Sequence, residues 1–186
     1  MLIMGVDPGT RCTGYGIVRT EGGQATCVEY GAITSPSRLS AWQCHVRIYD
    51  GMTRLVQEYA LEAVAVESQF FFKNAVAALR IGEARSAAML PLSRAGLAIA
   101  EYAPRRVKQA VVGRGNATKD QVAAMVATLL NLRGPIEPAD AADARFCFAI
   151  PYVESNLRQF LKRHQANPAL KTGVLCKTAK GRSAEV

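Results

Sequence analysis

Residues 1–10, MLIMGVDPGT, decide the fold because they place a carboxylate where a short apolar run stops. The run has the length of a buried strand, and Asp7-Pro8-Gly9 ends it abruptly. Asp-Pro-Gly is also an ordinary turn sequence, since proline fixes φ and glycine accepts a positive φ. Whether Asp7 belongs to a turn or to a functional site therefore depends on what the rest of the chain supplies.

The composition fits one globular domain in the cytoplasm. A chain of 186 residues that is 49% hydrophobic can bury roughly 70% of its unfolded surface. No apolar stretch approaches the roughly 20 residues of a membrane span, and no secretory signal pattern is visible. We expect a single domain over residues 1–165 and a loose, basic tail over residues 166–186.

The cysteines and histidines limit the kind of metal that the chain can hold. The 5 cysteines are scattered without a Cys-x-x-Cys spacing, which argues against a disulfide framework and a thiolate zinc site. Only 2 histidines are present. Any bound metal should therefore be a hard cation held by carboxylates.

A net charge of +8 indicates a polyanionic partner, and nucleic acid comes first because phosphate neutralisation releases counterions. The alternative is solubility charge spread over the surface. The charge is clustered instead, because residues 104–119 contain five basic residues and no acid. The five are Arg105, Arg106, Lys108, Arg114 and Lys119.

The first half of the chain predicts an antiparallel meander followed by a long helix. β-rich runs at residues 14–19 and 26–33 flank a glycine-bearing turn at residues 21–24. Residues 35–37 look like a helix start, and apolar residues then recur every three or four positions through Tyr59. We expect Trp42 and the tyrosines of this stripe in the core.

The second half predicts alternating strands and helices. Strands are expected at residues 61–66, ending at Glu67, and at 97–102, with a helix rich in small residues at 74–89. Further helices are expected at residues 104–112, from the capping box at Thr118, and from about residue 139. These elements predict an α/β fold, a mixed five-stranded sheet of a three-strand antiparallel meander plus two parallel strands, flanked by helices. A right-handed crossover would make the strand at 61–66 parallel to the first, so that Asp7 and Glu67 leave the carboxyl ends of neighbouring strands.

A second pair of acids, Asp140 and Asp143, is spaced three apart and shares one helical face. Such acids can also serve a helix dipole, or Asp140 an N-cap, and spacing alone leaves both interpretations open. If Asp7 and Glu67 meet this pair, their repulsion calls for cations such as Mg²⁺ or Mn²⁺. Two such ions roughly 4 Å apart can activate water and stabilise the leaving oxygen of a phosphodiester.

Three stretches carry a resemblance to a known family: GVDPGTRCTGYGIV, VESQFFFKNAVAALRIGEARSAA, and EYAPRRVKQAVVGRGNATKDQV followed by DAAD. Over roughly residues 1–150 the chain closely resembles the RuvC family of bacterial Holliday-junction resolvases, whose fold is ribonuclease-H-like. The resemblance implies a Mg-dependent endodeoxyribonuclease, a homodimer that cuts two opposed strands of a four-way DNA junction in homologous recombination and repair. It implies Asp7, Glu67, Asp140 and Asp143 as ligands of two Mg²⁺ per subunit, with Mn²⁺ able to substitute, and the RuvA–RuvB branch-migration complex as a partner.

The resemblance also assigns residues to DNA. It places Lys108 and Lys119 at the scissile phosphate, where a cation stabilises transition-state charge. Arg105, Arg106 and Arg114 are expected to make general backbone contacts. Three adjacent aromatics cannot all face one core in a strand, and the resemblance favours Phe70 for stacking on an unpaired base. Phe71 and Phe72 fit core or dimer contacts equally well.

The chain departs from the family pattern after Asp143. Small aliphatic residues are usual there, but this chain has Arg145-Phe146-Cys147-Phe148, and Pro151 interrupts the helix. This motivates a second hypothesis, a catalytically impaired junction-binding protein. A third is an actin- or hexokinase-like nucleotide-binding domain, which should need later glycine-rich phosphate loops and calorimetric ATP binding. Two symmetric cuts call for a dimer, and the helix at 74–89 is a candidate contact.

Overall fold

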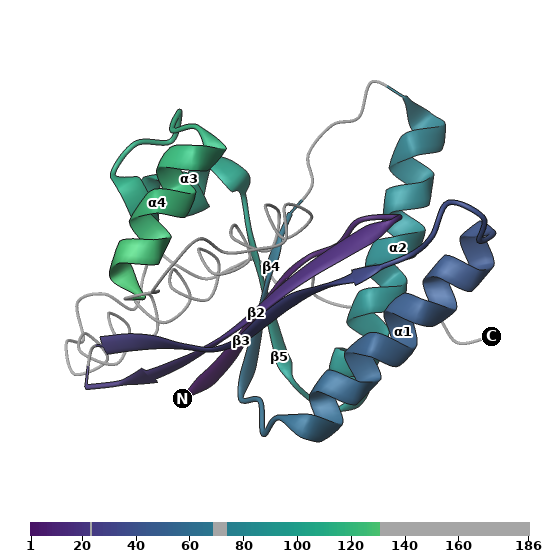
Figure 1. Ribbon diagram of the computed structural model, residues 1–186, viewed down its shortest axis with the longest axis horizontal. Coiled ribbons are helices and arrows are strands. Elements are labelled where there is room, and N and C mark those ends of the chain that lie inside the picture. Colours follow the sequence, from purple (N-terminus) through teal and green to yellow (C-terminus); the bar gives the residue numbers. More distant parts are fainter. Residues whose placement is uncertain (23, 69–73, 131–186) are drawn as a thin grey trace, which may run out of the picture.

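The computed structural model describes residues 1–22, 24–68 and 74–130. These residues form a five-stranded sheet in the order β3-β2-β1-β4-β5 with helices on both sides (Figure 1). The elements are β1 (Leu2–Asp7), β2 (Cys12–Glu21), β3 (Gln24–Thr34), α1 (Ala41–Glu58), β4 (Ala63–Glu67), α2 (Ala75–Arg94), β5 (Ala98–Tyr102), α3 (Pro104–Val112) and α4 (Lys119–Leu129).

The predicted mixed sheet is confirmed. β1, β2 and β3 are antiparallel, whereas β1 pairs with β4, and β4 with β5, in parallel. β2 and β3 extend beyond the predicted runs because their ladder continues from Cys12–Thr34 to Glu21–Gln24, with one irregularity near Val18. Cross-strand hydrogen bonds thus carry both strands past the residues with strong β-propensity.

The two faces of the sheet have different helical covers. Met4, Val6 and Val66 join the core beneath α1 and α2, whereas Val18 and Ala65 join the core beneath α3 and α4. Side chains alternate along each strand, so this division assigns every residue of β1 and β4 to one face. In Figure 1, α1 and α2 lie together on one side of the sheet, and α3 and α4 on the other.

Helix α1 begins later than predicted. Ser40, rather than residues 35–37, is its N-cap: the Ser40 hydroxyl accepts from the Gln43 N–H, and the Gln43 side chain accepts from the Ser40 N–H. The Arg11 guanidinium donates to the Pro36 and Leu39 carbonyls at 3.0 Å each and holds the preceding segment out of the helix. The reciprocal hydrogen bonds between Ser40 and Gln43 therefore set the helix start, in place of the weaker start signal at residues 35–37.

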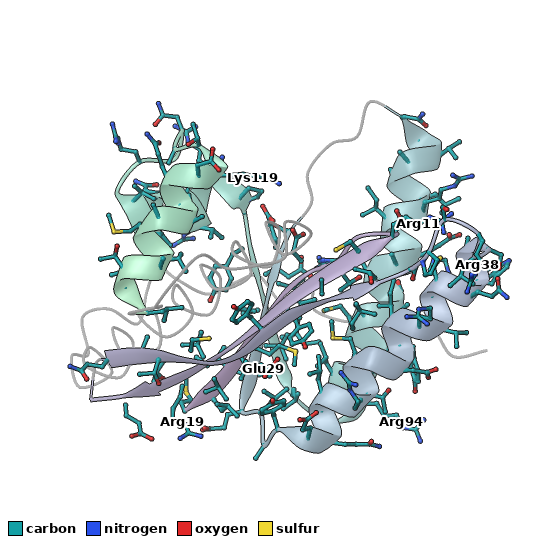
Figure 2. The ribbon with its side chains drawn as sticks, viewed as in Figure 1. Arg11, Arg19, Glu29, Arg38, Arg94 and Lys119 are labelled. Carbon is teal, nitrogen blue, oxygen red and sulfur yellow. The ribbon has the colours of Figure 1, made fainter. Side chains whose placement is uncertain are left out.

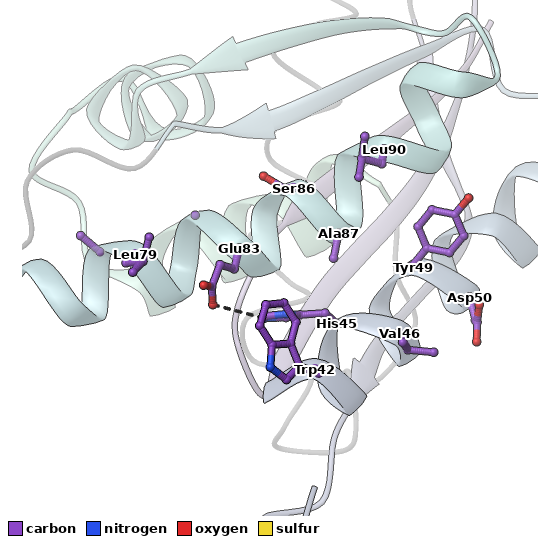
Figure 3. A pocket seen from close by; sticks show the side chains of 12 residues that line it. Trp42, His45, Val46, Tyr49, Asp50, Leu79, Glu83, Ser86, Ala87 and Leu90 are labelled. Atoms are coloured by element: carbon purple, nitrogen blue, oxygen red, sulfur yellow. Dashed lines mark ion pairs between the residues drawn. The ribbon is translucent and has the colours of Figure 1, made fainter. Parts of the chain in front are cut away.

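The predicted buried face of α1 is wrong at its amino end. Trp42 is 74% exposed and Val46 is 58% exposed, while Cys44, Ile48, Met52 and Leu55 are buried. Both stripes have helical spacing, so the spacing alone does not determine which one packs into the core. Trp42 and Val46 instead lie beside α2 (Figure 3).

The helices after α1 start where they were predicted, and α2 runs beyond its predicted end. Asn74 caps α2 by accepting from the Val76 and Ala77 N–H groups, and α2 continues through Pro91 to Arg94, beyond the predicted end. The predicted end at residue 89 was therefore too early. Gly113, with φ 78°, ends α3, and the predicted capping box of Thr118 begins α4. The helix predicted from residue 139 and the tail at 166–186 lie outside the described residues.

Cys27 and Cys44 form no disulfide in the described part of the chain. Burial, with a smaller effect of Glu29, raises the pKa of the Cys27 thiol to about 11. This thiol is therefore protonated at neutral pH and suits the core rather than nucleophilic chemistry. None of the helices in the described ranges has the length and apolar character that a membrane crossing requires.

Substitutions on the two stripes of α1 should separate its buried face from its exposed face. Met52→Ala removes a fully buried side chain and should lower the free energy of unfolding by about 2–5 kcal/mol. Gln57→Ala, at an exposed position of α1, should lower it by less than about 1 kcal/mol. Denaturant unfolding followed by circular dichroism measures both, and equal losses would contradict the burial described here.

Candidate active site at the carboxyl ends of β1 and β4

Asp7 and Glu67 are the last residues of two neighbouring parallel strands. The register pairs Val6 with Val66, so the two acids follow at the same level. Val6 and Val66 both face α1 and α2. Alternation therefore directs both carboxylates to the opposite face, which α3 and α4 cover. The prediction that these two acids leave adjacent strand ends is confirmed.

The loop after Asp7 is tied to β2 through a buried threonine. Thr13 Oγ1 donates to the Gly9 carbonyl at 3.0 Å and accepts from the Gly9 N–H at 3.4 Å. The Thr13 side chain is fully buried, so the hydroxyl is held in place by packing. No pattern in the sequence marked Thr13, because its role depends on the loop folding back onto the strand.

Gly9 is required for a different reason from the one predicted. Positive φ values occur at Gly22, Gly96 and Gly113 among the described glycines, and Gly9 does not share them. A Cβ at Gly9 would instead collide with the Cys12 carbonyl oxygen. The glycine permits close approach of two backbone segments beside Asp7.

The basic residues cluster on the unit formed by α3 and α4. Val107 and Val111 of α3 and Val122 and Val126 of α4 anchor this unit in the core beneath the sheet. The flanking side chains of Arg105, Arg106, Arg114 and Lys119 are exposed, and Lys108 is half-buried. Lys119 lies at the amino end of α4, at the same end of the sheet as the carboxyl ends of β4 and β5 (Figure 2).

The structure therefore puts two carboxylates and a basic surface on one face of the sheet. Carboxylate oxygens suit a hard divalent cation, so Asp7 and Glu67 fit the predicted metal chemistry. In residues 1–22, 24–68 and 74–130, no three His, Cys, Asp or Glu side chains form a metal-binding group. Asp140, Asp143 and Phe70, like Phe71 and Phe72, lie outside the described residues, as do Arg145–Phe148 and Pro151.

Comparison with known proteins identifies the family. The model of the family described as crossover junction endodeoxyribonuclease RuvC matches residues 3–152. The chain belongs to the RuvC family. The RuvC protein of Geobacter sulfurreducens is 48% identical over 77% of this chain and 87% of its own length. That of Protochlamydia amoebophila is 44% identical over 77% of this chain and 86% of its own length.

A solved RuvC structure has the same fold. Thermus thermophilus RuvC in complex with a Holliday junction substrate is similar with a TM-score of 0.78 and 31% identity, covering 86% of this chain and 96% of that one. The predicted ribonuclease-H-like fold is thereby confirmed. Membership of the RuvC family leaves the actin-like nucleotide-binding hypothesis without support.

A threonine pair on β2 should test the loop that carries Asp7. Thr13→Val keeps the shape of the side chain but removes both contacts to Gly9, and Thr20→Val makes the same change at the far end of β2. Because a displacement of about 1 Å can cost about 100-fold in rate, Thr13→Val should slow cutting of a Holliday junction by about 10- to 100-fold.

Thr20→Val is the matched control and should cut at nearly the normal rate. Thermal unfolding of both variants separates loss of folded protein from loss of geometry. Normal cutting by folded Thr13→Val would show that the Gly9 contacts do not position the site.

Proposed function

We propose that the chain is a structure-selective endodeoxyribonuclease that resolves four-way DNA junctions by paired, symmetric phosphodiester hydrolysis in homologous recombination and repair. The observation that carries this proposal is the placement of Asp7 and Glu67 at adjacent strand ends, facing the basic α3–α4 unit, in a RuvC family member. The Thermus thermophilus relative binds a Holliday junction as substrate.

The proposed metal ligands are Asp7, Glu67, Asp140 and Asp143, holding two Mg²⁺ per subunit with Mn²⁺ as a substitute. Bound ions of this kind supply an activated water and stabilise the leaving oxygen of the phosphodiester. The role of Asp7 and Glu67 is to present oxygen ligands from a rigid sheet edge. The proposed ligand set consists of carboxylates without a histidine, and such a set favours hard cations.

The basic residues have a separate role, which is to bring the DNA to the acids. Lys108 and Lys119 are proposed to contact the scissile phosphate and stabilise charge in the transition state. Arg105, Arg106 and Arg114 are proposed to contact the sugar-phosphate backbone, which positions the duplex arms without reading sequence. Phe70 is proposed to stack on a base in the opened junction.

An end-labelled four-way junction, beside a matched linear duplex, tests this function. With Mg²⁺ or Mn²⁺ the protein should make paired nicks on the junction alone, and a chelator should abolish them. Asp7→Asn should bind the junction but cut at least about 100-fold more slowly, because even outer-shell partners of a metal are worth 10- to 100-fold. Glu58→Gln, at an exposed position of α1, is the charge-matched control.

Two outcomes would contradict parts of the proposal. Normal cutting by Asp7→Asn would remove Asp7 from the metal site. Tight binding by the unaltered protein without nicks, in either metal, would favour the junction-binding alternative, which the sequence Arg145-Phe146-Cys147-Phe148 and Pro151 motivates.

The proposed protein is a homodimer, because symmetric cuts in two strands need two active sites. Between α1 and α2 lies an apolar groove of about 920 Å³ (Figure 3). Trp42 and Val46 line it from α1, and Leu79 and Leu90 line it from α2; Leu79 is 65% exposed and Leu90 is 59% exposed. A large exposed apolar patch typically marks an interface. The predicted contact helix at 74–89 thus provides one wall, and α1 provides the other.

The polar residues of the groove contact one another and the neighbouring tryptophan. His45 Nε2 lies 3.9 Å from Glu83 Oε2 and joins α1 to α2, and the Trp42 ring meets His45 edge-on with ring centroids 5.7 Å apart. His45 therefore contacts both Glu83 of α2 and Trp42 of α1. A second copy of the chain is the proposed occupant, since the same patch can pair with itself across a two-fold axis.

Leu79→Glu should convert the dimer to a monomer by placing a charge in this apolar surface. Met125→Glu, at an exposed position of α4, adds the same charge elsewhere and should leave the dimer intact. Light scattering at working concentration, with and without junction DNA, gives the masses. A dimeric Leu79→Glu protein would place the interface on another surface.

Three further parts of the proposal stay predictions. They are an association with the RuvA–RuvB branch-migration complex, a cytoplasmic location, and the division into a nuclease domain over residues 1–165 and a basic tail over 166–186.

A further inference from the structure

Arg85 of α2 reaches the end of strand β4 at Glu67. Its Nη1 donates a hydrogen bond to the Glu67 main-chain carbonyl at 2.9 Å, and its Nη2 lies 2.8 Å from Glu101 Oε1 on β5. The Arg85 side chain is only 22% exposed. One planar guanidinium therefore joins a helix to the carboxyl ends of two parallel strands.

The contact comes from the face opposite to the candidate site. Glu101 pairs in register with Val66, whose side chain faces α1 and α2. Glu101 and Arg85 therefore lie on that face, whereas alternation sends the Glu67 side chain to the other. Arg85 therefore binds the main chain of Glu67 from the face covered by α1 and α2, whereas the Glu67 side chain lies on the face covered by α3 and α4.

Glu67 needs such support because it lies where the sheet ends. The pairing of β1 with β4 runs to Val6–Val66, one residue before Glu67, while β5 continues to pair through Tyr102. The Ser68 N–H donates to the Tyr102 carbonyl at 2.9 Å, which fixes the following peptide on the β5 side. Arg85 adds a tether from the helical layer at the residue that carries the carboxylate.

The two contacts of Arg85 differ in what they contribute to the protein. Glu101 is 58% exposed, and an ion pair with an exposed partner contributes little to stability. The hydrogen bond to the Glu67 carbonyl, in contrast, restrains the orientation of one peptide. Small errors in that orientation are amplified at the end of the glutamate side chain, and about 1 Å can cost about 100-fold in rate.

We propose that Arg85 is a positioning residue for the metal site: it holds the Glu67 peptide, with Glu101 as its own anchor, so that the Glu67 carboxylate is set for a divalent cation. The proposal rests on the proposed function, since it takes Glu67 as a metal ligand. Arg85 itself touches neither metal nor DNA in this role.

The test compares Arg85→Met with Arg94→Met, which removes the same charge from an exposed position of the same helix. Arg85→Met should lower the rate of junction cutting under saturating Mg²⁺ by about 10- to 100-fold and weaken Mn²⁺ binding in calorimetry by at least about 10-fold. Junction affinity measured in Ca²⁺ should change by less than about threefold, as for Arg94→Met.

Glu101→Gln should give a smaller loss, and in the Arg85→Met background it should add nothing, because its effect acts through Arg85. Arg85→Lys should recover part of the rate, since an ammonium can satisfy one of the two acceptors. Thermal unfolding of each variant shows whether activity falls further than the folded fraction.

The outcomes separate the role of Arg85 from the nuclease activity itself. Cutting and Mn²⁺ binding by Arg85→Met equal to those of Arg94→Met would overturn the positioning role while leaving the nuclease intact. A loss that only follows the folded fraction, or Mn²⁺ affinity unchanged beside slower cutting, would also overturn it. An unaltered protein that neither cuts junctions nor binds Mn²⁺ would overturn the proposed function and this role together.

Discussion

The parallel pairing of β1 with β4 is the constraint on which the rest of the structure depends. It sets Asp7 and Glu67 at one level of the sheet, although 60 positions separate them in the chain. Because the pairing is in register through Val6 and Val66, both acids also share a face. A shift by one residue would send one carboxylate to each face and separate them by the thickness of the sheet.

The same alternation gives the sheet two faces with different helical covers. The face that receives Asp7 and Glu67 is covered by α3 and α4, whose apolar residues enter the core and whose basic residues remain at its edge. The other face is covered by α1 and α2, whose outer sides carry exposed Trp42 and Leu79. The proposed metal site and the proposed dimer contact therefore lie on opposite sides of one sheet and share no residues.

Rigidity at the strand ends comes from contacts behind the acids. Thr13 ties the loop after Asp7 to β2 through Gly9, and Arg85 ties the end of β4 to α2 and β5. Both Thr13 and Arg85 bind main-chain carbonyls, of Gly9 and Glu67. They therefore restrain the backbone next to each acid, and neither of these contacts uses a carboxylate oxygen. A site built from like charges needs such support, because the acids repel one another until cations neutralise them.

The sequence by itself determined the order of strands and helices, the strand ends at Asp7 and Glu67, and the basic character of residues 104–119. These follow from local signals: short apolar runs, the capping box at Thr118, and clustered charge. Tertiary structure decided which stripe of α1 is buried, why Gly9 is glycine, and which residues back the acids. The reason is physical: two stripes of equal helical spacing are distinguished only by what they pack against, and Thr13 and Arg85 acquire their partners only when distant segments meet.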